Sequence, residues 1–173
     1  MTVELLFLRG VNVGGHRKLA MADLCAVLGD CGAEVVQTYI QSGNAVYRGR
    51  LDPVAVGNAI DARLGFRPHV QVRSLAAWRA LVAAMPWPEV TDHKALHLFL
   101  TDGAPACDAA ALVAAAGPQE RVALVPGGVW LHTPQYLSGS RLAPVIDRLL
   151  GVPVTARNWR SVLAMRDMAE ALT

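Results

Sequence analysis

The sequence lacks the charge and composition that mark several large classes of protein. Only 17% of its 173 residues are charged, the formal net charge is +2, and aromatic residues make up 6%. So mild a charge excludes nucleic-acid binding that rests on bulk charge alone. The apolar fraction of 53% is too high for a disordered chain, and the length allows one large domain or two small ones.

Long apolar runs and CxxC cysteine pairs are also missing, and no secretory leader is predicted. No apolar run approaches the roughly 20 residues that a membrane helix needs, and the start carries no positively charged leader region. The three cysteines, Cys25, Cys31 and Cys107, are an odd set without CxxC spacing. Such a set is typical of free thiols in a reducing compartment. The sequence therefore predicts a soluble cytoplasmic protein with no membrane segment.

Established catalytic and metal-binding motifs do not occur. The five histidines show neither HxxxH nor Cys/His ligand spacing, and no GxSxG elbow is present. No carboxylate lies within a glycine-rich motif. The sequence therefore predicts no metal site and no cofactor, identifies no catalytic residue, and leaves open whether the protein is an enzyme.

What the sequence does contain is a pattern of strands and helices that occurs twice. Each copy has the order βαββαβ and is followed by one further helix, which Ser74 begins in the first copy and Asn158 in the second. We therefore predict an α+β fold of two ferredoxin-like halves, each an antiparallel sheet with helices on one face, plus a linker helix and a C-terminal helix. Pro86-Trp87-Pro88 marks the boundary, giving domains at residues 1–85 and 86–173. The expected strands are 3–8, 34–40, 44–48, 69–73, 95–101, 121–125, 129–132 and 152–157, and the helices in the second copy are 106–116 and 142–149.

A glycine loop with basic residues follows the first strand and has the sequence RGVNVGGHRK, residues 9–18. Backbone N–H groups of Asn12, Gly14 and Gly15 at the start of the next helix would favour an anion, but a turn that merely needs positive φ is the alternative. Arg9 would clamp an anion or pair with a nearby carboxylate, and Lys18 adds positive charge. The spacing fits neither GxGxxG nor GxxxxGK[ST].

The predicted topology gives this loop a neighbour that sequence distance hides. In a βαββαβ unit, the loop after the first strand and the turn between the second and third strands share one edge of the sheet. That places Gln41-Ser42-Gly43-Asn44 beside the glycine loop, and the same reasoning groups Arg141 with Arg157 in the second half. The candidate ligand-binding residues are Arg9, Asn12, Gly14, Gly15, Lys18, Gln41, Ser42, Asn44, Arg141 and Arg157.

Several motifs together resemble a known family. They are RGVNVGG followed by a basic residue and MADL, then TYIQSGN, and later SGSRL and TARNW. This combination is similar to a bacterial domain-of-unknown-function family, number 1697, over nearly the whole chain. The resemblance implies a two-part α+β protein with ferredoxin-like halves, and it implies no activity, substrate or cofactor. Arg141 stands where the family pattern favours lysine, and Ser161 where it favours threonine.

Three functional hypotheses follow from these residues. The leading one is a small cytoplasmic protein that binds an anionic small molecule bearing a phosphate or carboxylate, with nucleotides among the candidates. The second is a metal-independent transferase or hydrolase that uses the same loops, for which His16, His69 and Ser42 are the groups to check. The third is an RNA-binding or protein-interaction module, in which Tyr39 and Tyr47 would stack on bases; it has the weakest support. The oligomeric state is not specified by the sequence.

Overall fold

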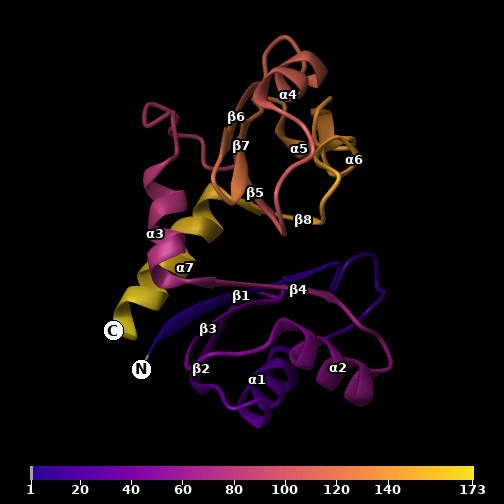
Figure 1. The fold of residues 1–173 in the computed structure, drawn as a ribbon, viewed down its shortest axis with the longest axis vertical. Coiled ribbons are helices and arrows are strands. Elements are labelled where there is room, and N and C mark those ends of the chain that lie inside the picture. Colours follow the sequence, from indigo (N-terminus) through magenta and orange to yellow (C-terminus); the bar gives the residue numbers. More distant parts are fainter. Residues whose placement is uncertain (1) are drawn as a thin grey trace. The chain divides into compact units, whose positions relative to one another are not determined.

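The computed structural model describes residues 2–173 and shows two similar halves, each built on a four-stranded antiparallel sheet (Figure 1). The described residues form eight strands and seven helices. The sheet orders are β2-β3-β1-β4 and β6-β7-β5-β8, which are the same arrangement built twice. The predicted α+β fold with two ferredoxin-like halves is therefore confirmed.

The first half follows the expected order closely. The Asp52 carboxylate caps α2 by accepting a hydrogen bond from the Val54 amide (2.9 Å), and Gly65 ends that helix at φ 75°. Register pairs Phe7 of β1 with Asn44 of β3, and Arg9 with His69 of β4. The ends of these strands therefore meet at one sheet edge. The elements are β1 (Val3–Arg9), α1 (Met21–Asp30), β2 (Glu34–Tyr39), β3 (Asn44–Arg48), α2 (Pro53–Leu64) and β4 (His69–Ser74).

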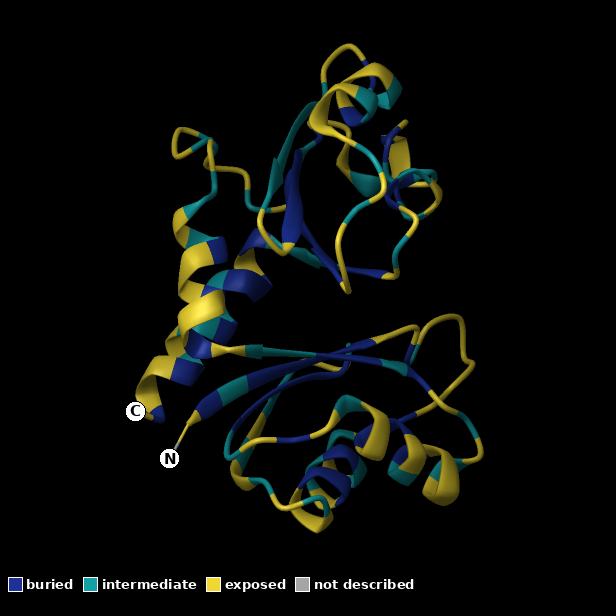
Figure 2. Ribbon diagram, viewed as in Figure 1, coloured by how far each residue is buried: buried dark blue, intermediate teal, exposed yellow. Residues whose placement is uncertain are grey.

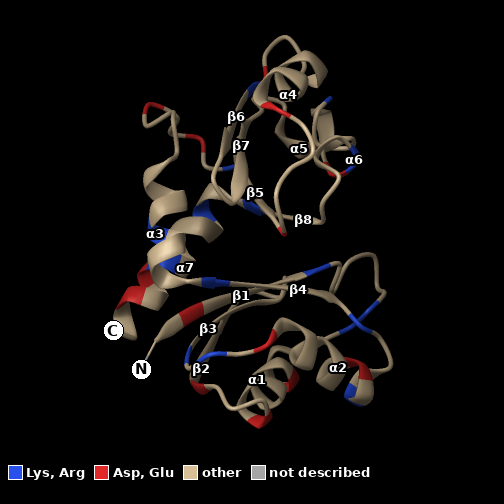
Figure 3. Cartoon of the chain, in the orientation of Figure 1, with Lys and Arg blue, Asp and Glu red and all other residues tan. Residues whose placement is uncertain are grey.

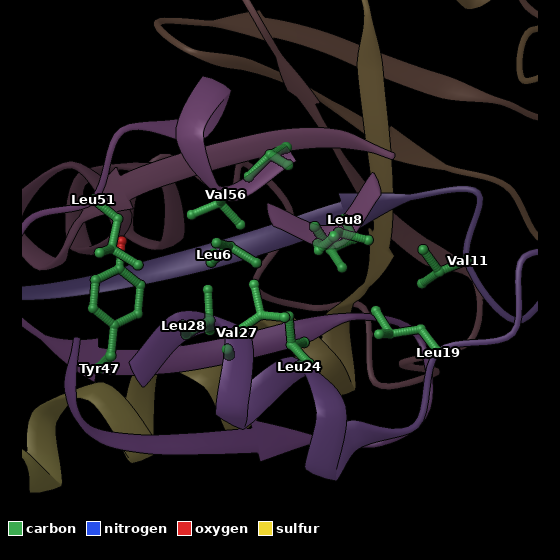
Figure 4. Close-up of a cluster of buried hydrophobic side chains, with 13 residues drawn as sticks. Leu6, Leu8, Val11, Leu19, Leu24, Val27, Leu28, Tyr47, Leu51 and Val56 are labelled. Carbon is green, nitrogen blue, oxygen red and sulfur yellow. The ribbon is translucent and has the colours of Figure 1, made fainter. Parts of the chain in front are cut away.

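The core of this half lies between the sheet and helices α1 and α2 (Figure 4). Leu6 and Leu8 alternate along β1 and face the helices, because successive strand residues point to opposite faces. Val11 and Leu19, at the two ends of the glycine loop, enter the same core and are 3% and 1% exposed. The loop is thus anchored at both ends, while residues 13–18 between them are exposed (Figure 2).

The second half repeats the order with shorter helices than the sequence predicts. Helix α4 begins three residues later than expected, where the Asp108 carboxylate accepts a hydrogen bond from the Ala111 amide (3.0 Å). Helix α6 begins at Ile146, since Pro144 disfavours helical backbone at the residue before it. The elements are β5 (Leu96–Thr101), α4 (Ala109–Ala115), β6 (Arg121–Val125), β7 (Gly128–His132), α5 (Tyr136–Gly139), α6 (Ile146–Leu150) and β8 (Val154–Asn158).

The two further helices are α3 (Leu75–Ala83) and α7 (Trp159–Ala171). Ser74 caps α3 by accepting from the Ala77 amide (3.2 Å), and Asn158 caps α7 by accepting from the Ser161 amide (2.9 Å). The chain forms two compact units, one of residues up to Arg79 together with Ala164–Thr173, and one of Ala80–Leu163. The domain boundary at residues 85 and 86 stays a prediction. Within residues 2–173, no helix has the length and apolar character needed to cross a bilayer.

One buried histidine lies in the second half. His97 of β5 is on the face that α4 and α6 cover, as is Phe99 two residues later. It is 7% exposed, and its buried Nδ1 has no hydrogen-bond partner among residues 2–173. Burial lowers the pKa of His97 to about 4, because the interior disfavours the charged imidazolium.

We expect His97 to make the protein sensitive to acid. Between about pH 6.5 and 4 the unfolded state binds a proton at this residue that the folded state does not, so stability falls as the pH falls. From pH 7 to pH 5 the loss is about 2 kcal/mol. Urea unfolding of the wild type and of His97→Leu at pH 7 and pH 5 measures this loss. The contributions of other titrating groups are the same in both proteins and cancel in the comparison. Equal losses in both proteins would contradict this role of His97.

Candidate functional site

Asn12 fastens the glycine loop to the turn between β2 and β3. Its side-chain Nδ2 donates to the carbonyl oxygens of Leu19 (2.8 Å) and Gln41 (2.7 Å), and its Oδ1 accepts from the Leu19 amide (2.9 Å). Asn12 has φ 55°, a left-handed conformation that asparagine tolerates better than most residues. The structure thus brings Asn12 and Gln41 together, and it uses the Asn12 amide to hold the loop in place.

The glycine pair lies at the tip of this loop and not at the start of a helix. Val13 and His16 form a bridge, and Gly14 and Gly15 between them have φ 59° and 78°. Positive φ at both central residues is the pattern of a type I′ turn. Helix α1 begins only at Met21. The expected placement of Asn12, Gly14 and Gly15 at a helix start was therefore wrong, because the chain first returns Leu19 to the core.

The turn after β2 is held by its own polar side chains. Asn44 is buried, and its Nδ2 donates to the Tyr39 carbonyl (3.1 Å) and to Ser42 Oγ (2.8 Å). Gly43 has φ 74°, and its carbonyl accepts from the Leu8 amide (2.8 Å). Ser42 and Asn44, both predicted to bind ligand, thus help to shape the turn that presents Gln41.

An open pocket of about 400 Å³ lies between the loop and the turn. Four of the predicted site residues line it together, although they come from two segments more than twenty residues apart in the sequence. Its six lining residues are Asn12, Gly15, Lys18, Leu19, Ala20 and Gln41.

The loop between β1 and α1 carries basic residues (Figure 3), and one of them, Lys18, lines this pocket. Lys18 is exposed, and no residue among 2–173 forms a hydrogen bond or ion pair with its ammonium group. Ala20 occupies the N-cap position of α1 and has no side chain that can accept from the first amides of the helix. Both the lysine and the positive end of the helix dipole therefore favour a negative group in the pocket.

Arg9 lies at the same sheet edge but is not among the residues that line the pocket. It is the last residue of β1, opposite His69, and it follows the helix-facing Leu8. Asp23, a nearby carboxylate on α1, forms an ion pair with Arg63 (3.2 Å).

The two candidates in the second half lie in different surroundings. Arg141 is exposed and lines a second pocket. Arg157 is half-buried in β8 opposite Leu98, and its Nη1 donates to the Ala156 carbonyl (2.7 Å). Burial lowers the pKa of Arg157 to about 10.

Sequence reasoning missed Glu120, which binds the two walls of the second pocket together. Its Oε2 accepts from the amides of Gly117 (2.6 Å) and Leu142 (3.2 Å), and its Oε1 accepts from the Ser140 hydroxyl. The sequence gives little indication of this role, because Glu120 lies outside every glycine-rich motif.

The aromatic residues needed for base stacking are not both accessible. Tyr47 is fully buried in the helix-facing core, and its hydroxyl donates to Glu4 Oε2 (2.9 Å). Burial, and then the hydrogen bond to Glu4, raise the pKa of Tyr47. Tyr47 therefore cannot stack on a base while the core is intact. In the part of the chain that the structure describes, no group of three His, Cys, Asp or Glu side chains could hold a metal ion.

The comparisons with known proteins concern family and fold. Residues 1–130 match the family model described as "Protein of unknown function (DUF1697)". The fold is similar to that of the conserved bacterial protein SP0830 from Streptococcus pneumoniae, with a TM-score of 0.67, 20% sequence identity, and coverage of 97% of this chain and 98% of that one. A search of curated proteins gave no match. The family model covers most of the chain, including RGVNVGG and TYIQSGN but not the later SGSRL and TARNW, and the chain therefore belongs to the DUF1697 family.

Proposed function

We propose that the protein is a small cytoplasmic binding protein for an anionic ligand that bears a phosphate or carboxylate, with nucleotides among the candidates. The ligand binds in the pocket between the glycine loop and the Gln41 turn. The observation that carries the proposal is the Lys18 ammonium, which has no partner among residues 2–173 and lies in one pocket with the uncapped start of α1. Three free cysteines support the cytoplasmic setting.

Binding is favoured over catalysis by the residues that line this pocket. Lys18 is the one titratable side chain among the six. Ser42, which an acyl-transfer mechanism would require as a nucleophile, accepts a hydrogen bond from Asn44 in the turn. The Gln41 amide, the backbone N–H groups and the Lys18 ammonium can all donate hydrogen bonds to a negatively charged ligand. Arg9 belongs to this proposal as a second cation at the same edge.

Replacing Lys18 by alanine is expected to weaken binding of inorganic phosphate and of a mononucleotide by about ten-fold or more, because a charge-assisted hydrogen bond is lost. Isothermal titration calorimetry measures the change. Lys94→Ala is the matched control, since Lys94 is an exposed lysine in the other unit. The proposal fails if neither ligand binds the wild type, or if both variants lose the same affinity.

A further inference from the structure

A second pocket lies within the second compact unit and has a volume of about 320 Å³. Two loops form it: the connection between α4 and β6, and the segment that runs from the end of β7 through α5 to Arg141. Its volume lies at the lower end of the range for small-molecule sites. The lining residues are Gly117, Pro118, Gln119, Glu120, Thr133, Pro134, Gln135, Gly139 and Arg141.

The walls of this pocket are fixed by hydrogen bonds that join the two loops. Glu120 from one loop accepts from Ser140 and Leu142 of the other, and it also accepts from Gly117 in its own loop. Burial alone would raise the pKa of Glu120, but these hydrogen bonds more than offset it, and the pKa is lowered. The carboxylate is therefore an anion whose accepting capacity is largely used within the protein.

Close approaches and backbone strain also shape the pocket. A Cβ at Gly139 would lie 2.7 Å from Gln135 Cβ, and a Cβ at Gly117 would lie 3.2 Å from Glu120 Oε2. Tyr136 between the walls has φ 59°, and its carbonyl accepts from the Thr133 hydroxyl (3.2 Å). Such strain in a surface loop costs free energy and is concentrated at functional sites.

Arg141 supplies a cation to this pocket. Its methylene groups pack against Gly117, where a Cβ would meet Cδ at 3.4 Å. No hydrogen bond or ion pair engages its guanidinium among the described residues 2–173. The prolines Pro118 and Pro134 offer apolar surface in the same pocket, and Gln119 and Gln135 offer amides.

We propose that this pocket binds a small organic monocarboxylate with an apolar body. The guanidinium of Arg141 binds the carboxylate, because its paired N–H donors match the two carboxylate oxygens. The two prolines contact the apolar body. The negative Glu120 in the wall disfavours a ligand with two negative charges, such as inorganic phosphate. This site shares no residue with the Lys18 pocket and does not rest on the function proposed there.

Benzoate is the probe, and inorganic phosphate is the comparison ligand. Wild-type protein titrated with benzoate and followed by amide chemical shifts is expected to show saturable changes at Gly117, Gln135 and Arg141. In Arg141→Ala the affinity should fall about ten-fold or more. Arg148→Ala, an exposed arginine of α6 that does not line the pocket, should bind as the wild type does.

Lys18→Ala should also keep the wild-type affinity for benzoate, which separates this site from the first. Three results would overturn the proposal. They are the absence of saturable shifts, equal affinities in wild type and Arg141→Ala, and tighter binding of phosphate than of benzoate through Arg141.

Discussion

Replacing Gly43 by alanine is expected to lower the free energy of unfolding by about 3 kcal/mol, through backbone strain and overpacking together. Gly43 is buried and has φ 74°, which an L-residue adopts only at a cost. A Cβ there would lie 2.7 Å from Leu8 Cβ and 2.9 Å from Val11 Cγ2. Leu8 and Val11 belong to the first core, so neither can move without opening a gap. Urea unfolding measures the loss.

Gly65→Ala provides the matched control for Gly43→Ala. Gly65 has φ 75°, almost the same as Gly43, but a Cβ there would meet no atom within 4 Å. Its loss is therefore expected to be about 1 kcal/mol, from backbone strain alone. Equal losses in the two variants would show that the contact of Gly43 with Leu8 and Val11 is not tight.

Asn12→Ala is expected to cost about 3 kcal/mol, since three hydrogen bonds of about 1 kcal/mol each are lost. The change leaves the Leu19 amide, the Leu19 carbonyl and the Gln41 carbonyl without the side chain that joins them. The loop should then separate from the turn, so the pocket that Asn12 helps to line should lose its shape. Chemical unfolding measures stability, and hydrogen exchange of the loop amides measures the local opening.

Two further variants distinguish the contribution of the Asn12 side chain to stability from that of its backbone conformation. Asn12→Gly keeps the φ of 55° without strain but still loses the three hydrogen bonds, so most of the loss should remain. Asn58→Ala, on the exposed face of α2, should change stability by less than about 0.5 kcal/mol. If Asn12→Gly is as stable as the wild type, the strained backbone and not the side chain accounts for the effect.

The fold was predictable because local patterns and topology agree. Ser74 and Asn158 begin helices in the structure, as the sequence predicts, and each caps its helix with a side-chain oxygen. The βαββαβ order alone brought the glycine loop beside Gln41, which the bond between Asn12 Nδ2 and the Gln41 carbonyl confirms. Topology sets which strand ends share an edge, so this conclusion needed no side-chain detail.

The roles of individual residues were less predictable, because they depend on distant main-chain groups. Asn12 bonds to groups seven and 29 residues away, and nothing in its local sequence identifies those partners. The backbone N–H groups of Asn12, Gly14 and Gly15 were expected at the start of the next helix, but that helix begins only at Met21. Glu120 was missed since a lone carboxylate after Gly117-Pro118 carries no motif, and its partners appear only after folding.

Amide chemical shifts during a titration with inorganic phosphate test anion binding at the first pocket most directly. We predict saturable shifts at Gly15, Lys18, Ala20 and Gln41, which line the pocket, and their loss in Lys18→Ala. Lys94→Ala should retain them, because Lys94 lies in the other unit. Shifts that spread over exposed arginines throughout the chain, or that persist unchanged in Lys18→Ala, would contradict binding at this site.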